Sequence, residues 1–254
     1  MATFVELGVW ALITGGTPLI LASVPFLRTR FSDQASHLML GLSAGILGGL
    51  VIFDILPGSF QAAADEGLPP QVVPIAIGAG FFFLLLVERH LIGASERGQG
   101  HFENGRRIQP FGTLAMSALT VHGTIDGFVI PLAFELGGSV GTVIVLAVAL
   151  HQIPDSFAAL GVGLSTRTDR RTALTYVLIT AIDTPIGILL GVLFLGGGTQ
   201  WLPLGLGFSA GTFLFVSAAD LIPELQHRSR SLLVTASIVF GFFVVLGLSF
   251  LPIV

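Results

Sequence analysis

The sequence contains no cysteine and no lysine, and only 10% of its 254 residues are charged. The absence of cysteine excludes disulfide bonds and thiolate metal sites. Soluble domains carry roughly 25% charged residues, whereas 53% of the residues here are hydrophobic. The composition therefore predicts an integral membrane protein that has no room for a sizeable soluble domain.

Long apolar runs fill most of the chain. A membrane-spanning helix needs about 20 mostly apolar residues. Eight segments meet this requirement: 4–26, 37–57, 71–92, 112–134, 140–164, 172–196, 202–222 and 231–252. We therefore predict an all-α protein in which residues 1–254 form a single transmembrane domain of eight helices.

The basic residues are distributed on one side of the predicted membrane. All 11 are arginines, and each lies at the end of, or after, an odd-numbered span: Arg28, Arg30, Arg89, Arg97, Arg106, Arg107, Arg167, Arg170, Arg171, Arg228 and Arg230. The even-numbered loops carry only acids. Because basic loops stay in the cytoplasm, both termini are expected outside the cytoplasm of a cell-membrane protein.

The second and seventh spans share a sequence repeat. G-x-S-A-G begins at Gly41 and again at Gly207, and each copy is followed eight residues later by Asp, two aliphatic residues and Pro. The two copies are 166 residues apart and cross the membrane in opposite directions. Spans 1–3 and 6–8 thus form an expected inverted pair around spans 4 and 5, a 3+2+3 inverted-repeat arrangement typical of alternating-access transporters. Small-residue packing alone would explain the glycines, but not the matched Asp and Pro.

Two histidine–aspartate pairs lie inside apolar spans. His122 and Asp126 occupy the fourth span, and His151 and Asp155 occupy the fifth, with Pro154 between the latter two. A spacing of four residues places each pair on one helix face. Buried ionisable groups at membrane depth are costly and usually functional, and nitrogen and oxygen ligands suit divalent transition metals. Two interhelical His–Asp hydrogen bonds are the structural alternative.

Two further polar residues accompany these pairs. Asp183 lies in the middle of the sixth span without an arginine in that span, so it is a candidate additional ligand, or else a carboxylic acid kept neutral by desolvation. Gln152 follows His151 and is either a secondary ligand or part of an ordinary hydrogen bond between helices.

Acids also lie near the ends of the two repeat spans. Asp54 is expected near the outer face and Asp220 near the cytoplasmic face, with Glu224 just beyond. They are candidates for carboxylates along a metal pathway, and the alternative is that each is a solvated helix end.

These motifs together resemble the ZIP (Zrt/Irt-like protein) family of divalent-metal transporters, in its prokaryotic form. The fourth span of that family carries a motif like H-N-x-P-E-G, which stands here as His122-Gly123-Thr124-Ile125-Asp126-Gly127. The fifth carries a related H-x-x-P-E, which stands here as His151-Gln152-Ile153-Pro154-Asp155. The resemblance covers essentially the whole chain.

The resemblance implies a metal centre at mid-membrane. His122, Asp126, His151 and Asp155 would form its primary site, and Gln152 and Asp183 would belong to a secondary one. Gly123 stands where many members have asparagine, and aspartate replaces glutamate at both 126 and 155. The missing side chain at 123 and the shorter carboxylates at 126 and 155 predict one strong metal site and a weak or absent second site.

The leading hypothesis is a transporter, not an enzyme, that admits Zn²⁺ as its substrate into the cytoplasm, with Mn²⁺, Fe²⁺, Co²⁺ or Cd²⁺ as other candidates and no organic cofactor. We expect a divalent metal ion and the lipid bilayer as partners and no nucleic acid, and the resemblance also allows a homodimer. An intramembrane metalloprotease would need H-E-x-x-H, which is absent. A metal-free, proton-conducting membrane protein stays open as an alternative.

Overall fold

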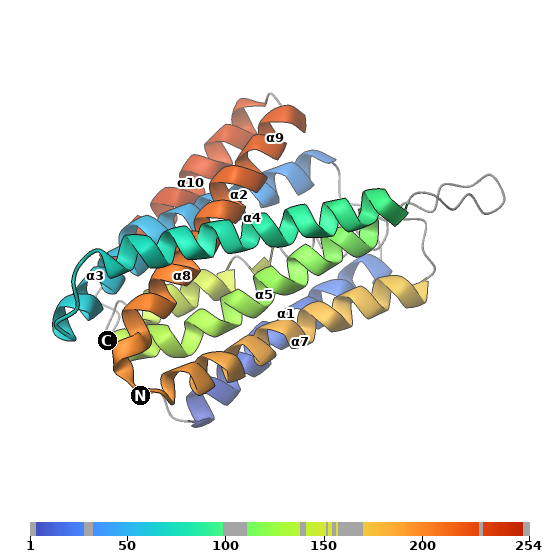
Figure 1. The fold of residues 1–254 in the computed structure, drawn as a ribbon. Helices are drawn as coiled ribbons and strands as arrows, with labels where there is room; N and C mark the ends of the chain where they lie inside the picture. Colours follow the sequence, from blue (N-terminus) through green and yellow to red (C-terminus); the bar gives the residue numbers. More distant parts are fainter. Residues whose placement is uncertain are drawn as a thin grey trace.

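The computed structural model describes residues 4–27, 33–98, 111–137, 141–150, 152–153, 156, 170–228 and 231–250. These residues form helices joined by short turns, with no strand among them (Figure 1). The long helices are α1 (Phe4–Leu27), α2 (Asp33–Leu50), α4 (Val72–Gly98), α5 (Phe111–Leu136), α7 (Arg170–Leu195), α8 (Leu202–Leu214) and α10 (Leu232–Ser249). The shorter ones are α3 (Leu56–Asp65), α9 (Ile222–Arg228) and the helix Gly141–Leu150.

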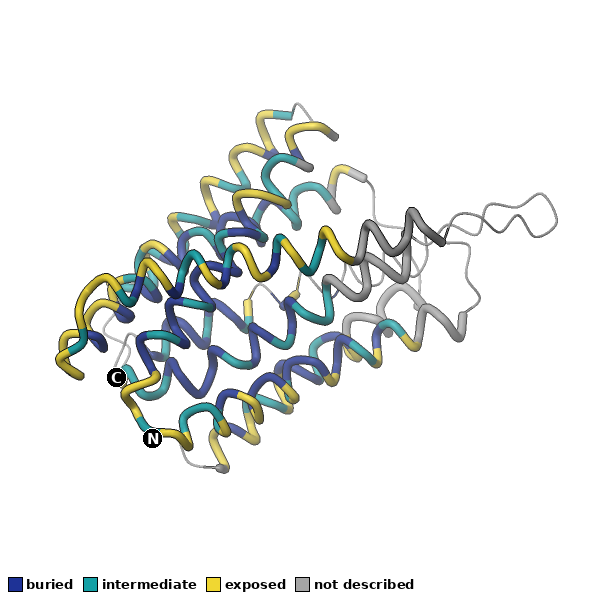
Figure 2. Tube along the Cα trace, in the orientation of Figure 1, coloured by how far each residue is buried: buried dark blue, intermediate teal, exposed yellow. Residues whose placement is uncertain are grey.

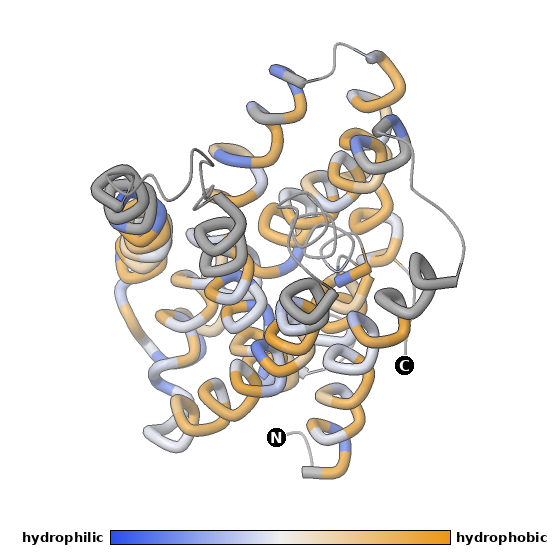
Figure 3. Tube along the Cα trace, turned by 90° about the vertical axis from the view of Figure 1, so that its right-hand side faces the viewer, coloured by the Kyte–Doolittle hydropathy of each residue, from blue (hydrophilic) through white to orange (hydrophobic). Residues whose placement is uncertain are grey.

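Six of the helical segments are long and apolar enough to cross a membrane: His37–Asp65, Val72–His90, Leu119–Leu136, Thr175–Leu195, Thr199–His227 and Leu232–Ser249. Two shorter apolar helices, Val5–Ile20 and Gly141–Leu150, lie within the remaining two predicted spans. Hydrophobic residues occur on all of these helices, outer faces included (Figure 3). The protein is therefore a multi-pass, all-helical membrane protein, as the composition predicted.

The described helices pack in two groups. In the first, α7 packs against both α1 and α5. In the second, α2 packs against α10 and α4 packs against α8. We call these the α5 group (α1, α5 and α7) and the α8 group (α2, α4, α8 and α10). The two groups meet chiefly where α5 faces α8, in the most deeply buried part of the molecule (Figure 2).

Glycines bring the backbones of the α8 group into contact at two equivalent places. A Cβ at Gly45 of α2 would collide with the carbonyl oxygen of Ile238 on α10. A Cβ at Gly211 of α8 would collide in the same way with the carbonyl oxygen of Ile77 on α4. Gly45 and Gly211 are the last glycines of the two G-x-S-A-G motifs. The same helix–helix contact is thus made twice.

The partner helices contribute a second matched pair of glycines. A Cβ at Gly80 of α4 would meet the carbonyl oxygen of Phe208, and one at Gly241 of α10 would meet that of Leu42. Gly80 and Gly241 lie 161 residues apart, the separation that also relates Ile77 to Ile238. Close backbone approach therefore requires glycine on both sides of each contact.

A π-helical turn interrupts each repeat span at the same position. The turn η1 (Val51–Ile55) follows α2, and the turn η3 (Phe215–Leu221) follows α8. The amide of Leu56 donates to the carbonyl of Val51, and that of Ile222 donates to the carbonyl of Ser217. Each bond spans five residues, and the two are again 166 residues apart.

The predicted ends of these two spans, at residues 57 and 222, were too early. The helical path continues through α3 to Asp65 and through α9 to Arg228. Pro57 lies in the first turn of α3, where its missing amide donor costs nothing. The preceding π turn already rearranges the hydrogen-bond ladder there, so proline does not end the helix.

A hydrogen bond joins the second and sixth connections. The hydroxyl of Thr199, in the short 3₁₀ turn η2 (Thr199–Trp201), donates to Oε1 of Glu66 at 2.7 Å. Glu66 follows α3, and Thr199 precedes α8. The second and sixth connections therefore lie at the same end of the molecule, as alternating spans require.

Candidate metal site

The histidine–aspartate pair of the fourth span lies in the interior. His122 and Asp126 lie on one face of α5 and are 5% and 0% exposed. Nε2 of His122 lies 3.6 Å from Oδ2 of Asp126. The His122 ring also packs edge-on against Phe213 of α8, with 6.0 Å between ring centroids. His122 therefore contacts the α8 group at the boundary between the two groups.

Asp183 approaches the same face of α5 from α7. Its side chain is 3% exposed, and its Oδ1 accepts hydrogen bonds from the amide of Thr184 at 2.6 Å and from the Thr184 hydroxyl at 3.2 Å. A Cβ at Gly123 would lie 2.6 Å from Oδ2 of Asp183. The carboxylate thus occupies the space that a side chain at position 123 would need.

Gln152 forms a hydrogen bond between helices. It is 4% exposed, and its Nε2 donates to the Thr184 hydroxyl at 3.3 Å. Its Oε1 is buried and accepts no hydrogen bond within the described part of the chain. The sequence left a metal ligand and a helix–helix hydrogen bond as alternatives; the hydrogen bond is present, and the buried oxygen is still available to a cation.

These side chains enclose one small cavity of about 10 Å³. Asp126, Gln152 and Asp183 line it, together with Leu119, Gly123, Ser156 and Thr180. A cavity of roughly this size holds one water molecule or one ion of similar size. Three of the predicted site residues therefore meet at one point, with His122 beside Asp126.

The ligand set cannot be completed from the described residues alone. His151, Asp155 and Pro154 of the fifth span lie outside them. Among the residues that are described, no three His, Asp or Glu side chains come close enough together to hold a metal ion. A full site at this cavity needs ligands from the fifth span, which is where the sequence places His151 and Asp155.

The two candidate pathway acids have different surroundings. Asp54 in η1 is only 2% exposed, and the Ser249 hydroxyl of α10 lies 3.0 and 3.2 Å from its two carboxylate oxygens. The solvated helix end offered as an alternative is therefore wrong for Asp54. Asp220 in η3 is exposed, and Glu224 follows in α9.

A carboxylate that the sequence reasoning missed lies beside Asp220. Glu88 of α4 is close enough for its charge to interact with that of Asp220. Glu88 and Ser249 are 161 residues apart, as are Gly80 and Gly241, so they occupy equivalent places beside Asp220 and Asp54. The match between Val73, Ile77 and Gly80 and their counterparts at this separation was the signal that could have revealed Glu88.

Comparison with known proteins settles the family. A family profile described as ZIP zinc transporter matches residues 94–249. The chain belongs to the ZIP zinc transporter family. The family prediction made from the His–Asp motifs is thus confirmed, and the chain is a transporter of zinc or another divalent metal.

Similarity to individual ZIP proteins extends over most of the chain. The chain is 26% identical over 250 residues to the zinc transporter GufA of Myxococcus xanthus, and the match covers 95% of this chain and 97% of that protein. It is 23% identical over 245 residues to the zinc transporter ZIP9-B of Xenopus laevis, covering 81% of this chain and 80% of that protein. The chain therefore matches nearly the full length of GufA and four fifths of ZIP9-B.

Proposed function

We propose that this ZIP protein carries Zn²⁺ across the cell membrane into the cytoplasm by alternating access through one mid-membrane site. His122, Asp126, His151 and Asp155 would bind the ion, and Gln152 and Asp183 would complete its surroundings. The observation that carries the proposal is the cavity shared by Asp126, Gln152 and Asp183, with His122 beside it. The zinc transporters GufA and ZIP9-B support zinc as the substrate.

Burial supports a role in binding a cation. Asp126 and Asp183 are both almost completely removed from solvent within a predicted span. A carboxylate at that depth is unfavourable unless a cation or hydrogen-bond donors compensate it. A divalent ion would supply that compensation, and imidazole and carboxylate groups are ligands that Zn²⁺ accepts.

The packing at Gly123 supports a single strong site. Where many family members carry asparagine, this chain has no side chain, and the Asp183 carboxylate lies in that space. The cavity between α5 and α7 is about 10 Å³, which suits one ion better than two. Asp183 would therefore belong to the same compact site as Asp126.

The helix arrangement supports movement of one group against the other. The contacts of α2 with α10 and of α4 with α8 repeat each other through matched glycines. This is what a 3+2+3 inverted repeat would produce, and rocking of one unit against another is how such transporters work. The α5 group, with the fifth span, would move against the α8 group and expose the site to each side in turn.

The pathway would run between acids at the two membrane faces. The arginine distribution puts the connections after odd-numbered spans in the cytoplasm and both termini outside. Asp54 would then lie near the outer end, and Asp220 and Glu224 near the cytoplasmic end. The metal gradient would drive uptake, and bound metal would exchange with protons because its ligands must be deprotonated.

Uptake of radioactive zinc into proteoliposomes tests the proposal. We expect saturable uptake by the unchanged protein and its loss in Asp126→Ala and Asp155→Ala. Asp65→Ala is the matched control, because Asp65 is an exposed acid at the end of α3. Full uptake by Asp126→Ala would refute the site, and unlabelled Mn²⁺, Fe²⁺, Co²⁺ and Cd²⁺ as competitors would rank the metals.

A further inference from the structure

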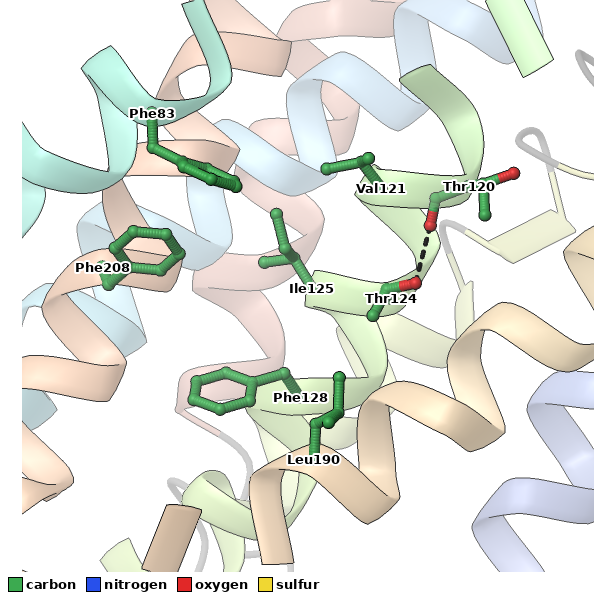
Figure 4. A pocket seen from close by; sticks show the side chains of 8 residues that line it. All are labelled: Phe83, Thr120, Val121, Thr124, Ile125, Phe128, Leu190 and Phe208. Atoms are coloured by element: carbon green, nitrogen blue, oxygen red, sulfur yellow. Dashed lines mark hydrogen bonds between the residues drawn. The ribbon is translucent and has the colours of Figure 1, made fainter. Parts of the chain in front are cut away.

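A second and larger pocket is lined by a different set of α5 residues from the small cavity. Figure 4 shows the side chains that line it. Its volume is about 280 Å³. Phe83 of α4 and Phe208 of α8 form one wall, Leu190 of α7 forms an edge, and a face of α5 that includes Thr124 and Ile125 forms the opposite wall. The pocket therefore lies at the boundary between the α5 group and the α8 group.

The lining offers little to a polar ligand. Apart from aromatic and aliphatic side chains it contains only the two threonines Thr120 and Thr124. The Thr124 hydroxyl already donates to the carbonyl oxygen of Thr120 at 2.8 Å. Because a buried water molecule needs two to four polar partners, water would be poorly held here, and the pocket selects an apolar occupant.

The mouth of the pocket faces the bilayer. Phe83 and Leu190 are 43% and 46% exposed, and both lie inside candidate membrane spans. The apolar surface continues beyond them through Phe82, Leu86 and Ile186, which are also exposed. At this depth the apolar molecules that surround the protein are lipid chains.

The position of the pocket favours a lipid chain as its occupant. Its lining is apolar apart from the two threonines, and all eight lining residues lie within candidate membrane spans. The hydrocarbon chains of the bilayer are therefore the molecules that meet its mouth. A single flexible hydrocarbon chain can enter it and restore the dispersion contacts that an empty pocket lacks.

We propose that this pocket binds one acyl chain of a membrane phospholipid. The chain enters from the bilayer between Phe83 and Leu190 and contacts Phe208 and the α5 face. Val121 and Ile125, which contact the chain, directly precede His122 and Asp126 in α5. The bound chain therefore packs against the helix that carries the first half of the metal site.

A consequence for transport rests on the proposed function. Because the pocket is formed by both helix groups, a chain inside it contacts the two surfaces that would move past each other. The flexible chain would fill the space between these surfaces while still letting them slide past each other. A larger, fixed side chain in the pocket would therefore slow zinc uptake.

Photo-labelling of the unchanged protein tests the binding. The protein is reconstituted with phosphatidylcholine that carries a diazirine in the middle of one acyl chain, irradiated, and digested for mass spectrometry. We expect adducts on the pocket face of α5 and on Phe208, in addition to adducts on lipid-facing side chains such as Phe240 of α10, which is 64% exposed. Adducts on the lipid-facing side chains alone, whether the pocket is empty or covered by a second copy, would overturn the proposal.

A matched pair of variants on α7 makes the test specific. Leu190→Phe places a larger side chain at the edge of the pocket, whereas Leu189→Phe makes the same change at a neighbouring exposed position that does not line it. We expect labelling of Phe208 to be lost in Leu190→Phe and retained in Leu189→Phe. Equal labelling of Phe208 in both variants would overturn the assignment of the pocket.

Zinc uptake by the same two variants tests the consequence. We expect slower uptake in Leu190→Phe and unchanged uptake in Leu189→Phe. Loss of labelling with unchanged uptake would refute the effect on transport but leave the lipid site intact. If the unchanged protein is labelled in the pocket but takes up no zinc, the proposed function fails and the lipid site stands.

Discussion

The carboxylate of Asp183 lies against the Cα of Gly123 on the facing helix, where a Cβ would be only 2.6 Å from its Oδ2. Glycine at 123 and aspartate at 183 are therefore compatible as a pair, and a side chain at 123 would displace the acid. Gly123→Asn, which would bring this chain closer to the common family motif, is thus expected to damage the site.

Gly123→Ala is predicted to raise the KM for zinc uptake, because the added methyl group pushes Asp183 away from the cavity. Overpacking of this kind costs about 1–3 kcal/mol. Gly78→Ala on α4 is the control, since a Cβ there meets nothing within 4 Å. Adding Asp183→Ala should make the effect of Gly123→Ala disappear, and simple additivity of the two changes would contradict the predicted contact.

Zinc is predicted to stabilise the folded protein through Asp126. A ligand that binds only the folded state at 100 times its Kd adds about 2.7 kcal/mol to the free energy of unfolding. Thermal unfolding with Zn²⁺ and with Mg²⁺ measures this gain, which we expect for Zn²⁺ in the unchanged protein and in Asp65→Asn but not in Asp126→Asn. A metal-free, proton-conducting protein would show no gain in any of them.

Ser249→Ala is predicted to destabilise the protein by about 1–3 kcal/mol, because it removes a hydrogen-bond donor from the buried carboxylate of Asp54. Ser237→Ala on the same helix is the comparison, since the Ser237 hydroxyl donates to the carbonyl of Val234 within its own helix. Unfolding in denaturant distinguishes the two. Equal losses would show that the contact with Asp54 contributes nothing beyond that of an ordinary helix serine.

Gly45→Ala and Gly211→Ala are predicted to destabilise the protein by similar amounts, about 1–3 kcal/mol or more, because each forces apart a backbone contact of the same geometry. Gly247→Ala on α10 should change little, since a Cβ there meets nothing within 4 Å. Thermal unfolding of the three variants measures this. A large loss in only one of the first two would contradict the equivalence of the contacts.

Locking the two helix groups together is predicted to stop transport. The chain has no cysteine, so cysteines at Leu132 of α5 and Gly205 of α8, which are in contact across the boundary, can be joined by a short thiol-reactive cross-linker. Cysteines at Gly41 and Ser237, in contact within the α8 group, form the control pair. Full zinc uptake after complete cross-linking of the first pair would exclude rocking between the groups.

The fold could be predicted largely from apolar runs and one repeat, since the eight predicted segments all contain apolar helices. The contacts within the repeat could not be predicted in this way, because they are made by backbone atoms that every residue has. The continuation of the helices past Pro57 and Pro223 was missed for a related reason: proline usually marks a helix end, and a π turn has no simple sequence signal.

The candidate site shows the same division. A four-residue spacing was enough to place His122 and Asp126 on one buried face. That Asp183 lies against Gly123, and that Ser249 reaches Asp54, depends on which helices are neighbours and at what height. No pattern within a single span contains that information.

The two π turns have a consequence for how each repeat span presents its residues. A helix advances about 100° per residue, so the one surplus residue in each turn rotates everything beyond it by roughly that angle relative to an uninterrupted helix. Within each continuous helical span, the face that carries Asp54 or Asp220 is therefore rotated about the helix axis relative to the face that carries G-x-S-A-G, compared with an uninterrupted helix. Deleting a single residue from η1 would bring them back into phase and turn Asp54 away from Ser249.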